Sequence, residues 1–310
     1  MAAEEQRAAE TTATTTGARL LKGAPVARAL TEELAARAAA LREAGRVPTL
    51  ALVRVGARED DMAYERGILS RCEKVGIEAC RVELAQDASQ AGLESALRAL
   101  AADAKVHGIL LFRPLPAGLD EAAAAACVPA SKDVDCMGAE GLLATLSGQG
   151  SVFAPCTAEA VVTLLDHYGV ELDGARVAVV GRSLVIGRPV AALLLARNAT
   201  VTVCHTHTAD LAAACREVDV IVAAAGHART VGAACVRAGQ VVVDVGVNVD
   251  SVTGALVGDV DAEAVAPVVS ALTPVPGGVG AVTTAVLARH VIEAAERAAT
   301  ANAQGGFACR

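Results

Sequence analysis

Aromatic residues are scarce in this 310-residue chain, which has no Trp, two Tyr and three Phe, or 2% in total. Its core must therefore be built from Ala, Val, Leu and Ile. Hydrophobic residues make up 54% of the chain and charged residues 20%, a composition that excludes a disordered or fibrous protein. The length exceeds what one ordinary core holds, so we expect two domains or one large α/β unit.

The chain also lacks an excess of positive charge and long apolar runs. Its net charge of −8 excludes a general nucleic-acid-binding surface. No apolar run approaches the ~18 residues that a membrane span needs. Residues 1–17 contain acidic side chains and no apolar segment of the kind that marks a secretory signal. We therefore expect a soluble, cytoplasmic protein with no nucleic-acid and no membrane partner.

The nine cysteines are an odd number, nowhere form a C-x-x-C pair and fall mostly in apolar stretches. Cytosolic proteins keep such thiols reduced, so we expect buried free cysteines. Zinc sites require clustered ligands, and the sequence shows none, so no metal is predicted.

Apolar runs typical of strands alternate with helical patterns, which predicts a parallel α/β fold. The predicted strands are 49–56, 77–84, 108–112, 176–181, 199–205, 218–226 and 240–246, and the predicted helices are 27–44, 60–74, 90–101, 158–168, one containing Pro189 in its first turn, and 281–299. Thr31 and either Asp60 or Asp61 are candidate helix caps, and Gly76 is a candidate stop. The four closely spaced strands of the second half indicate a Rossmann-like nucleotide domain.

These patterns predict two domains between two tails. Residues 19–155 form the first domain and 156–281 the second, while helix 282–299 packs back on the first. Residues 1–18 and 300–310 have the compositions of mobile tails.

The first strand of the second half ends in a candidate phosphate loop, G-R-S-L-V-I-G, from Gly181 to Gly187. A glycine after the strand lets the backbone approach a pyrophosphate, and the following helix offers unpaired N–H groups and a positive dipole end. Gly181, Arg182, Ser183 and Gly187 are therefore candidate cofactor-binding residues. A plain strand-to-helix turn is the alternative interpretation.

The strand 199–205 lacks the acidic residue that usually holds the ribose diol of NAD, since the first carboxylate after it is Asp210. Arg182 and Thr206 are positioned in sequence to hold a 2′-phosphate through charge and a hydroxyl group. NADP is therefore favoured over NAD.

Eight segments in order resemble the methylenetetrahydrofolate dehydrogenase/cyclohydrolase family: GILLFRPLP (108–116), SKDVDCMG (131–138), APCTAEA (154–160), VVGRSLVIGRP (179–189), NATVTVCHTHT (198–208), VDVGVN (243–248), GDVD (258–261) and TPVPGGVG (273–280). The resemblance implies a folate-binding domain joined to a Rossmann NADP-binding domain with the active site in a cleft between them, and a homodimer. It implies hydride transfer from 5,10-methylenetetrahydrofolate to the nicotinamide, and in many members hydrolysis of the 5,10-methenyl product to 10-formyltetrahydrofolate.

The resemblance also assigns roles to individual residues. Tyr64 matches the active-site tyrosine that flanks the folate ring, and Asp135 matches the aspartate that holds the pterin, so both are candidate catalytic residues. Without the family, the alternative interpretation is core packing for Tyr64 and a loop cap or turn residue for Asp135. Substrate contacts are further implied at Phe112, Arg113 and the loop residues Pro276, Gly277 and Gly278, and a cofactor contact at Val247. Taken alone, that loop is also compatible with a tight connection before a helix.

Two positions depart from the family pattern. The family helix reads Tyr-x-x-x-Lys, whereas Ile68 stands at the lysine position here, one turn after Tyr64. The strand that usually ends Val-Gln-Leu-Pro carries Phe112 in place of the glutamine. Hydride transfer depends mainly on positioning, whereas hydrolysis needs a group that handles protons. Because Arg113 does not readily release its proton, we expect the dehydrogenase to be retained and the cyclohydrolase to be weakened, absent or rearranged.

Two other classes fit parts of the sequence. A non-catalytic folate- or NADP-binding protein would bind the cofactor without hydride transfer. An amino-acid or shikimate-type dehydrogenase would turn over a small acid without folate and without any need for Asp135.

Overall fold

The computed structural model describes residues 17–148, 153–251 and 253–305. The chain divides into two compact units, one of residues 1–27 with Thr157–Thr283 and the other of Arg28–Cys156 with the chain from Thr284 onward. Helices α2 (Gly23–Glu43), α7 (Cys156–His167) and α11 (Gly280–Gly305) contain the points at which the chain passes from one unit to the other. Of the two predicted tails, residues 1–16 and 306–310, with Cys309, lie outside the described residues, whereas 300–305 continue helix α11 and are not a tail.

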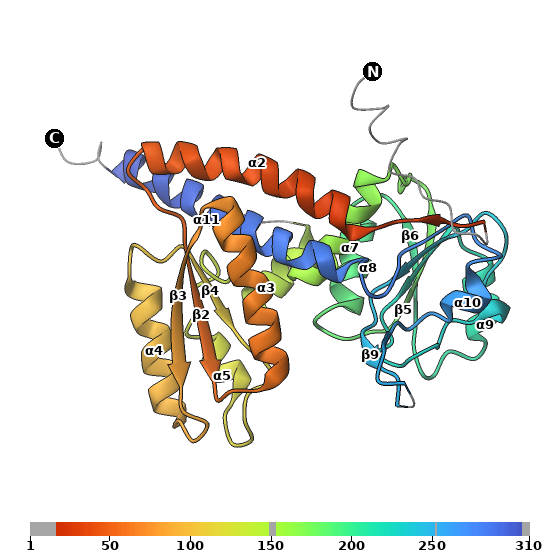
Figure 1. Ribbon diagram of the computed structural model, residues 1–310, viewed down its shortest axis with the longest axis horizontal. Helices are drawn as coiled ribbons and strands as arrows, with labels where there is room; N and C mark the ends of the chain where they lie inside the picture. Colours follow the sequence, from red (N-terminus) through yellow and green to blue (C-terminus); the bar gives the residue numbers. More distant parts are fainter. Residues whose placement is uncertain (1–16, 149–152, 252, 306–310) are drawn as a thin grey trace. The chain divides into compact units, whose positions relative to one another are not determined.

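The unit that contains Arg28–Cys156 is built on a three-stranded parallel sheet in the order β3-β2-β4. Its elements are β2 (Thr49–Val55), α3 (Glu59–Val75), β3 (Glu78–Leu84), α4 (Gln90–Ala102), β4 (Gly108–Leu111), α5 (Glu121–Ala125) and α6 (Ala139–Ser147). Figure 1 shows α3 and α4 on opposite sides of these strands. Ala51 and Val53 pack with Leu93 and Leu97 of α4, whereas Arg54 points to Glu65 of α3, so the alternation along β2 separates the two layers.

The helix ends agree with the sequence only in part. Gly76 ends α3 in the left-handed conformation, with φ of 89°, as predicted. The predicted caps of α3 are wrong, because the residue at the cap position is Arg58. Asp60 and Asp61 lie inside the first turn, where their negative charges interact favourably with the positive end of the helix dipole. Thr31 lies in the middle of α2, because that helix begins already at Gly23.

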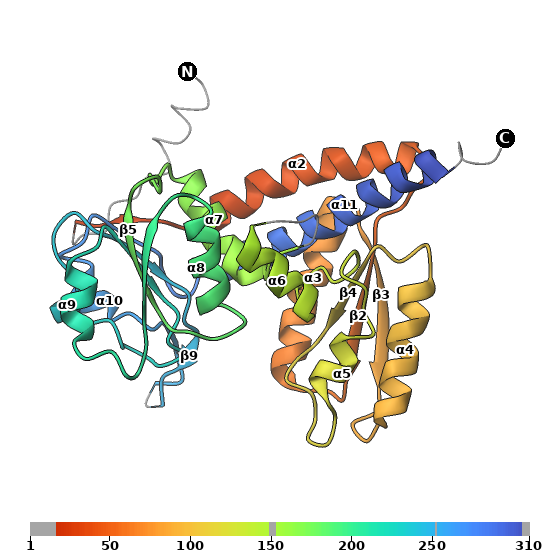
Figure 2. The same ribbon diagram turned by 180° about the vertical axis from the view of Figure 1, so that it is seen from behind.

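The other unit is built on a six-stranded parallel sheet in the order β1-β11-β8-β7-β5-β6. Its strands are β1 (Arg19–Leu20), β5 (Arg176–Val180), β6 (Thr200–Cys204), β7 (Val220–Ala223), β8 (Val241–Asp244) and β11 (Ala271–Leu272). The same unit contains four helical elements, namely α8 (Gly187–Leu195), α9 (Leu211–Arg216), η1 (Ala233–Cys235) and α10 (Ala262–Val265). A separate antiparallel pair is formed by β9 (Asn248–Val249) and β10 (Leu256–Val257). Figure 2 shows α8 and α9 on opposite sides of β5.

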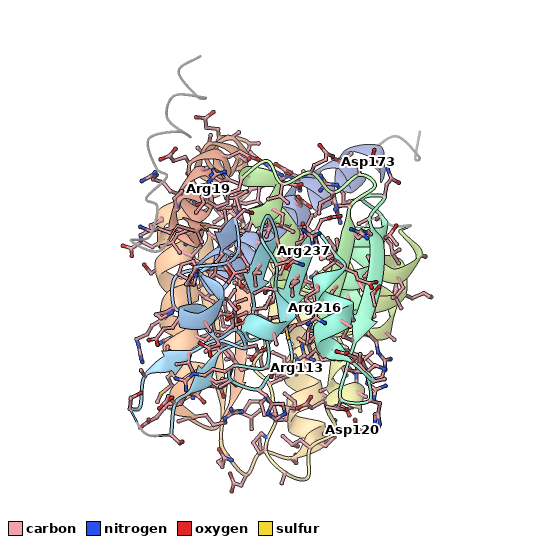
Figure 3. The ribbon with its side chains drawn as sticks, turned by 90° about the vertical axis from the view of Figure 1, so that its right-hand side faces the viewer. Arg19, Arg113, Asp120, Asp173, Arg216 and Arg237 are labelled. Carbon is pink, nitrogen blue, oxygen red and sulfur yellow. The ribbon has the colours of Figure 1, made fainter. Side chains whose placement is uncertain are left out.

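This unit confirms the predicted mixed α/β class, and its four longest strands, β5 to β8, are those predicted from sequence. Pro189 lies in the first turn of α8, as predicted. Near the sheet, Arg237 donates from Nε to the Arg216 carbonyl at 2.8 Å, and both arginines are labelled in Figure 3. None of the eight cysteines in the described residues forms a disulfide, and six of them are buried. No described helix is long and apolar enough to cross a membrane.

Candidate functional site

The loop that follows α5 is fixed by its lysine and its first aspartate. Lys132 Nζ donates to the carbonyls of Ala101 and Asp103, at 2.8 and 2.7 Å, near the end of α4. The Asp133 carboxylate is buried and accepts from the Met137 and Gly138 amides at 2.9 and 2.8 Å. Asp133 is therefore the residue that caps this loop, which leaves the second aspartate two residues later for another role.

That second aspartate, Asp135, lies beside Arg113. Their Oδ2 and NH2 atoms are 3.9 Å apart, and each side chain is about a quarter exposed. Burial raises the pKa of Asp135, while the Arg113 guanidinium and a hydrogen bond from Cys156 act in the opposite direction. Arg113, labelled in Figure 3, thus helps to keep an accessible carboxylate ionised. An ionised carboxylate accepts two hydrogen bonds side by side.

Tyr64 stands next to this pair. Its ring meets the ring of Phe112 edge to face, with centroids 6.1 Å apart and an interplanar angle of 81°. Phe112 is 5% exposed, whereas Tyr64 keeps 37% of its surface. Desolvation, followed by the negative charge of Asp135, raises the pKa of Tyr64 well above its usual value. The phenol therefore stays protonated at neutral pH, with a ring face and a hydroxyl donor to offer a ligand.

A buried ion pair fixes the helix that carries Tyr64. Glu65 is 5% exposed and accepts from Arg54 Nε at 3.2 Å. Arg54 also lies 3.2 Å from Glu83 of β3 through NH2. Breaking such a buried pair leaves an uncompensated charge, so Glu65 holds α3 against the strands. Glu65 is not predictable from sequence, since a single acidic residue on a helix gives no signal of such a pair.

In the other unit, two glycines shape the loop between β5 and α8. Gly181 has φ of 129°, and a Cβ there would lie 2.0 Å from the Ala224 carbonyl oxygen. A Cβ on Gly187 would lie 2.3 Å from the carbonyl oxygen of Gly181. Only glycine fits at either position, so the loop is compact and its backbone is open to a close-lying phosphate group. These two glycines fit a dinucleotide.

Ser183 has a structural role in this loop. Its Oγ accepts from the Ile186 and Gly187 amides, at 3.1 and 3.3 Å. The prediction that the α8 start offers unpaired N–H groups is therefore wrong for these two amides, because the serine hydroxyl occupies them. Leu184 and Val185 are 57% and 49% exposed, so the exposed stretch 183–185 is the part that remains to meet a phosphate.

The residues expected at a 2′-phosphate lie at the end of β6. Thr206 is exposed. Desolvation, followed by the positive charges of Arg182 and His207, lowers the pKa of His205. Asp210 accepts from the Ala213 amide at 2.8 Å and caps α9. Its carboxylate is thus committed to a helix, which supports the absence of an acid for a ribose diol.

Val247 and the loop residues Pro276, Gly277 and Gly278 line one cavity of about 250 Å³. Val247 is 67% exposed. Gly277 has φ of 101°, and its carbonyl accepts from the Gly23 amide at 2.8 Å. The structure therefore brings a predicted cofactor residue and the predicted substrate loop together within this unit.

Two buried aspartates that the sequence analysis gave no role hold the segment with Val247. Asp244 accepts from the amides of Gly246, Asp259 and Val260 at 2.9–3.0 Å. Asp259 accepts from the Gly226 amide at 2.8 Å and from Asn248 Nδ2 at 2.9 Å. Burial raises the pKa of Asp244 to about 6, partly offset by these amides. Asp244 lies in the motif VDVGVN and Asp259 in the motif GDVD. The sequence therefore marks both residues, but it does not show that their carboxylates hold the neighbouring backbone.

Comparison with known families covers both halves of the chain. Residues 21–135 match the catalytic domain of tetrahydrofolate dehydrogenase/cyclohydrolase, and residues 155–299 match the NAD(P)-binding domain of the same enzymes. The chain belongs to the tetrahydrofolate dehydrogenase/cyclohydrolase family.

Individual members of this family align over nearly their whole length. The "Bifunctional protein FolD" of Clostridioides difficile is 47% identical over 279 residues, 90% of this chain and 97% of that protein. The crystal structure of a bifunctional FolD from Campylobacter jejuni has a TM-score of 0.87 at 36% identity, covering 90% of this chain and 98% of that one. The Trypanosoma brucei enzyme, solved with NADP and an inhibitor, has a TM-score of 0.85 at 35% identity, covering 91% and 98%.

Within the tetrahydrofolate dehydrogenase/cyclohydrolase fold, the two unusual residues of this chain are part of the packed interior. Ile68 is 1% exposed, one helical turn after Tyr64. Phe112 donates its backbone amide to Val53 and packs its ring against Tyr64. Both apolar side chains are thus buried, and their match to the family's lysine and glutamine positions stays a prediction. Among the described residues, no group of three or more His, Cys, Asp or Glu side chains is placed to hold a metal ion.

Proposed function

We propose that this protein is an NADP-dependent 5,10-methylenetetrahydrofolate dehydrogenase of one-carbon folate metabolism. The reaction moves a hydride from the methylene carbon to the nicotinamide and leaves the 5,10-methenyl cation. The observation that carries the proposal is the grouping of Tyr64, Arg113 and Asp135 in a chain whose two halves both match this family. The alternative is a non-catalytic folate- and NADP-binding protein, which would bind NADP without reducing it.

On the folate side, we assign the pterin to Asp135. The pterin ring presents an amino group and a ring N–H side by side, and a carboxylate meets both. Arg113 keeps the carboxylate charged, and Tyr64 supplies a flat surface and a hydroxyl donor beside it. Phe112 packs edge to face against the tyrosine ring. Because hydride transfer depends on alignment, these contacts are the main contribution of the protein to this step.

On the cofactor side, we assign the pyrophosphate to the loop at Gly181, Ser183 and Gly187, and the 2′-phosphate to Arg182 and Thr206. Val247 lines the cavity that adjoins the Pro276–Gly278 loop and is assigned to the nicotinamide end. When bound, NADP accepts the hydride. Asp210 caps α9, so its carboxylate is not placed to bind the ribose diol of NAD, and this supports NADP as the cofactor.

For the second reaction, hydrolysis of the methenyl cation, two observations oppose each other. The relatives are named bifunctional. In this chain, Ile68 and Phe112 are buried apolar side chains where the family pattern has Lys and Gln. Hydrolysis needs an activated water and a group of tunable pKa, which a lysine provides and an isoleucine does not. We therefore infer that cyclohydrolase activity is weakened or absent.

A stopped assay with 5,10-methylenetetrahydrofolate and NADP tests both parts of the proposal. We expect NADPH and the methenyl product to accumulate together, because reduction is retained and hydrolysis is slow. Formation of 10-formyltetrahydrofolate above its uncatalysed rate would contradict the hydrolytic part alone. Cofactor binding without reduction of NADP or NAD would favour the binding-protein alternative.

Replacing Arg182 by alanine is expected to remove the preference for NADP. A charge-assisted contact to a phosphate contributes about 1.5–3 kcal/mol, so KM for NADP should rise roughly 10- to 100-fold. KM for NAD, which has no 2′-phosphate, should change little. Steady-state kinetics with both cofactors measures this, with Arg197→Ala as the control, since Arg197 is an exposed arginine just after α8 that pairs with Asp166. An unchanged ratio of the two KM values would defeat the assignment of Arg182.

We further propose that the protein is a homodimer, as the family resemblance implies, and that it is cytoplasmic. We also propose that residues 19–155 with helix 282–299 bind folate and that residues 156–281 bind NADP. Size-exclusion chromatography with light scattering tests the first of these.

A further inference from the structure

Behind Asp135, two buried side chains from distant parts of the sequence meet one carbonyl group. His290 of α11 is 1% exposed, and its Nδ1 lies 2.8 Å from the Val134 carbonyl oxygen. Cys156 at the start of α7 is also 1% exposed, with Sγ 3.2 Å from the same oxygen. The two side chains are themselves 3.6 Å apart, between Sγ and Nδ1. Val134 immediately precedes Asp135.

The contact at Val134 fixes which ring nitrogen of His290 carries a hydrogen. A carbonyl oxygen only accepts, so a nitrogen 2.8 Å from it must donate. Nδ1 therefore bears a hydrogen that points to Val134. The ring is held in this orientation by Phe153, whose ring stacks on it with centroids 4.8 Å apart and an interplanar angle of 29°. The guanidinium carbon of Arg297 lies over the Phe153 ring, 4.7 Å from its centroid.

The single proton of the Cys156 thiol has two acceptors within reach, the Val134 carbonyl and the Asp135 carboxylate. A charged acceptor forms the stronger hydrogen bond. The thiol donates to the Val134 carbonyl, where the His290 N–H competes with it for the same oxygen. A second donor weakens the first bond, so His290 favours sharing of the thiol proton with the charged carboxylate. The three side chains thus form a line from His290 through Cys156 to Asp135.

We propose that His290 is a positioning residue for Asp135, acting through Val134 and Cys156 to orient the carboxylate that receives the pterin. This inference rests on the proposed function, in which Asp135 binds the folate. Four other titratable or charged groups also face Asp135, namely Arg113 after β4, Tyr64 on α3, Cys156 on α7 and Asp133 in its own loop. A change confined to His290 leaves all of these in place.

The test is the pH dependence of kcat/KM for 5,10-methylenetetrahydrofolate in two variants. In His290→Phe the ring still stacks on Phe153 but loses its donor, so the thiol turns to Val134 and Asp135 loses a hydrogen bond. The acidic limb of the profile should move up by about one pH unit, since one such bond is equivalent to about one pKa unit. His290→Asn keeps an N–H near the place of Nδ1 and should restore the wild-type profile.

Further variants separate positioning from general loss of structure. Cys156→Ala removes the same link and should give the same shift, and combining it with His290→Phe should add nothing. His107→Phe changes another buried histidine of this unit, whose Nδ1 accepts from the Thr49 amide, and should leave the profile unchanged. An unshifted profile in both His290→Phe and Cys156→Ala, or a shift in His290→Asn equal to that in His290→Phe, would overturn the proposal.

One measurement does not depend on turnover. ¹⁵N NMR of histidine-labelled wild-type protein reports the tautomer, and the His290 signal is assigned by its loss in His290→Asn. A hydrogen on Nδ1 supports the proposal, and a neutral ring protonated only on Nε2 overturns it. If the wild-type protein does not oxidise methylenetetrahydrofolate but shows the Nδ1 hydrogen, then the proposed function fails while the hydrogen-bonded line stands.

Discussion

The Asp135→Asn variant is expected to lose about 100- to 1,000-fold in kcat/KM for 5,10-methylenetetrahydrofolate while NADP still binds. The amide keeps one acceptor oxygen and turns an NH₂ group toward a pterin donor, so one hydrogen bond is lost and the other loses its charge. Hydrogen bonds to a charged group contribute about 1.5–3 kcal/mol each, and each 1.36 kcal/mol is tenfold in rate. Arg113, 3.9 Å away, also loses its ion-pair partner.

Steady-state kinetics gives this loss, and calorimetric titration with NADP shows whether the cofactor half is intact. The matched control is Glu140→Gln, an exposed carboxylate in the first turn of α6, five residues further along the chain. It carries the same change of charge without a contact to the proposed pterin site and should retain wild-type kinetics. Turnover by Asp135→Asn within a few-fold of wild type would mean that the pterin is bound elsewhere.

Long buried segments are the part of the fold that sequence predicts well. Strands such as Val177–Val180 and Leu50–Val53 are continuous apolar runs, because both faces of a parallel sheet are covered. Two strands of the six-stranded sheet escaped prediction, β1 and β11, each of two residues. They are defined by backbone bonds, including Arg19 N to Ser270 O and Leu21 N to Leu272 O, both 2.9 Å. Two residues carry no periodicity, so no local pattern reveals them.

Helix ends and supporting residues escaped for a related reason. The start of α2 is set by the Gly23 amide donating to the Gly277 carbonyl, a contact 254 positions along the chain, rather than by Thr31. In the candidate site, Tyr64 and Asp135 are predicted through their motifs, and their ligand roles stay predictions. His290 is not predicted, because its partner Val134 is 156 positions away in sequence. Direct ligand contacts leave motifs, whereas the residues that orient them are defined only by the folded chain.

The double variant Ile68→Lys, Phe112→Gln is expected to raise methenyltetrahydrofolate hydrolysis by about 100-fold or more over wild type. Residue 68 lies one turn after Tyr64 and is 1% exposed, so burial would lower the pKa of a lysine there. A neutral amine near pH 7 takes a proton from an attacking water, and general base catalysis of this kind contributes 10²- to 10⁴-fold. A glutamine at position 112, close to the Tyr64 ring, offers the amine a hydrogen-bond partner.

The matched control is Ile68→Met, Phe112→Gln, which makes the same change at position 112 and keeps an apolar side chain of similar volume at position 68. It should hydrolyse the methenyl cation no faster than wild type, so any gain in the lysine variant belongs to the amine. Retained dehydrogenase activity in both variants shows that the site has kept its shape. If wild type already hydrolyses the cation rapidly, and the rate survives separate replacement of Tyr64, Arg113 and Asp135, then catalysis uses another group. If the folded lysine variant gains nothing, the amine alone does not account for the missing reaction, and the apolar packing around Ile68 excludes the water that hydrolysis consumes.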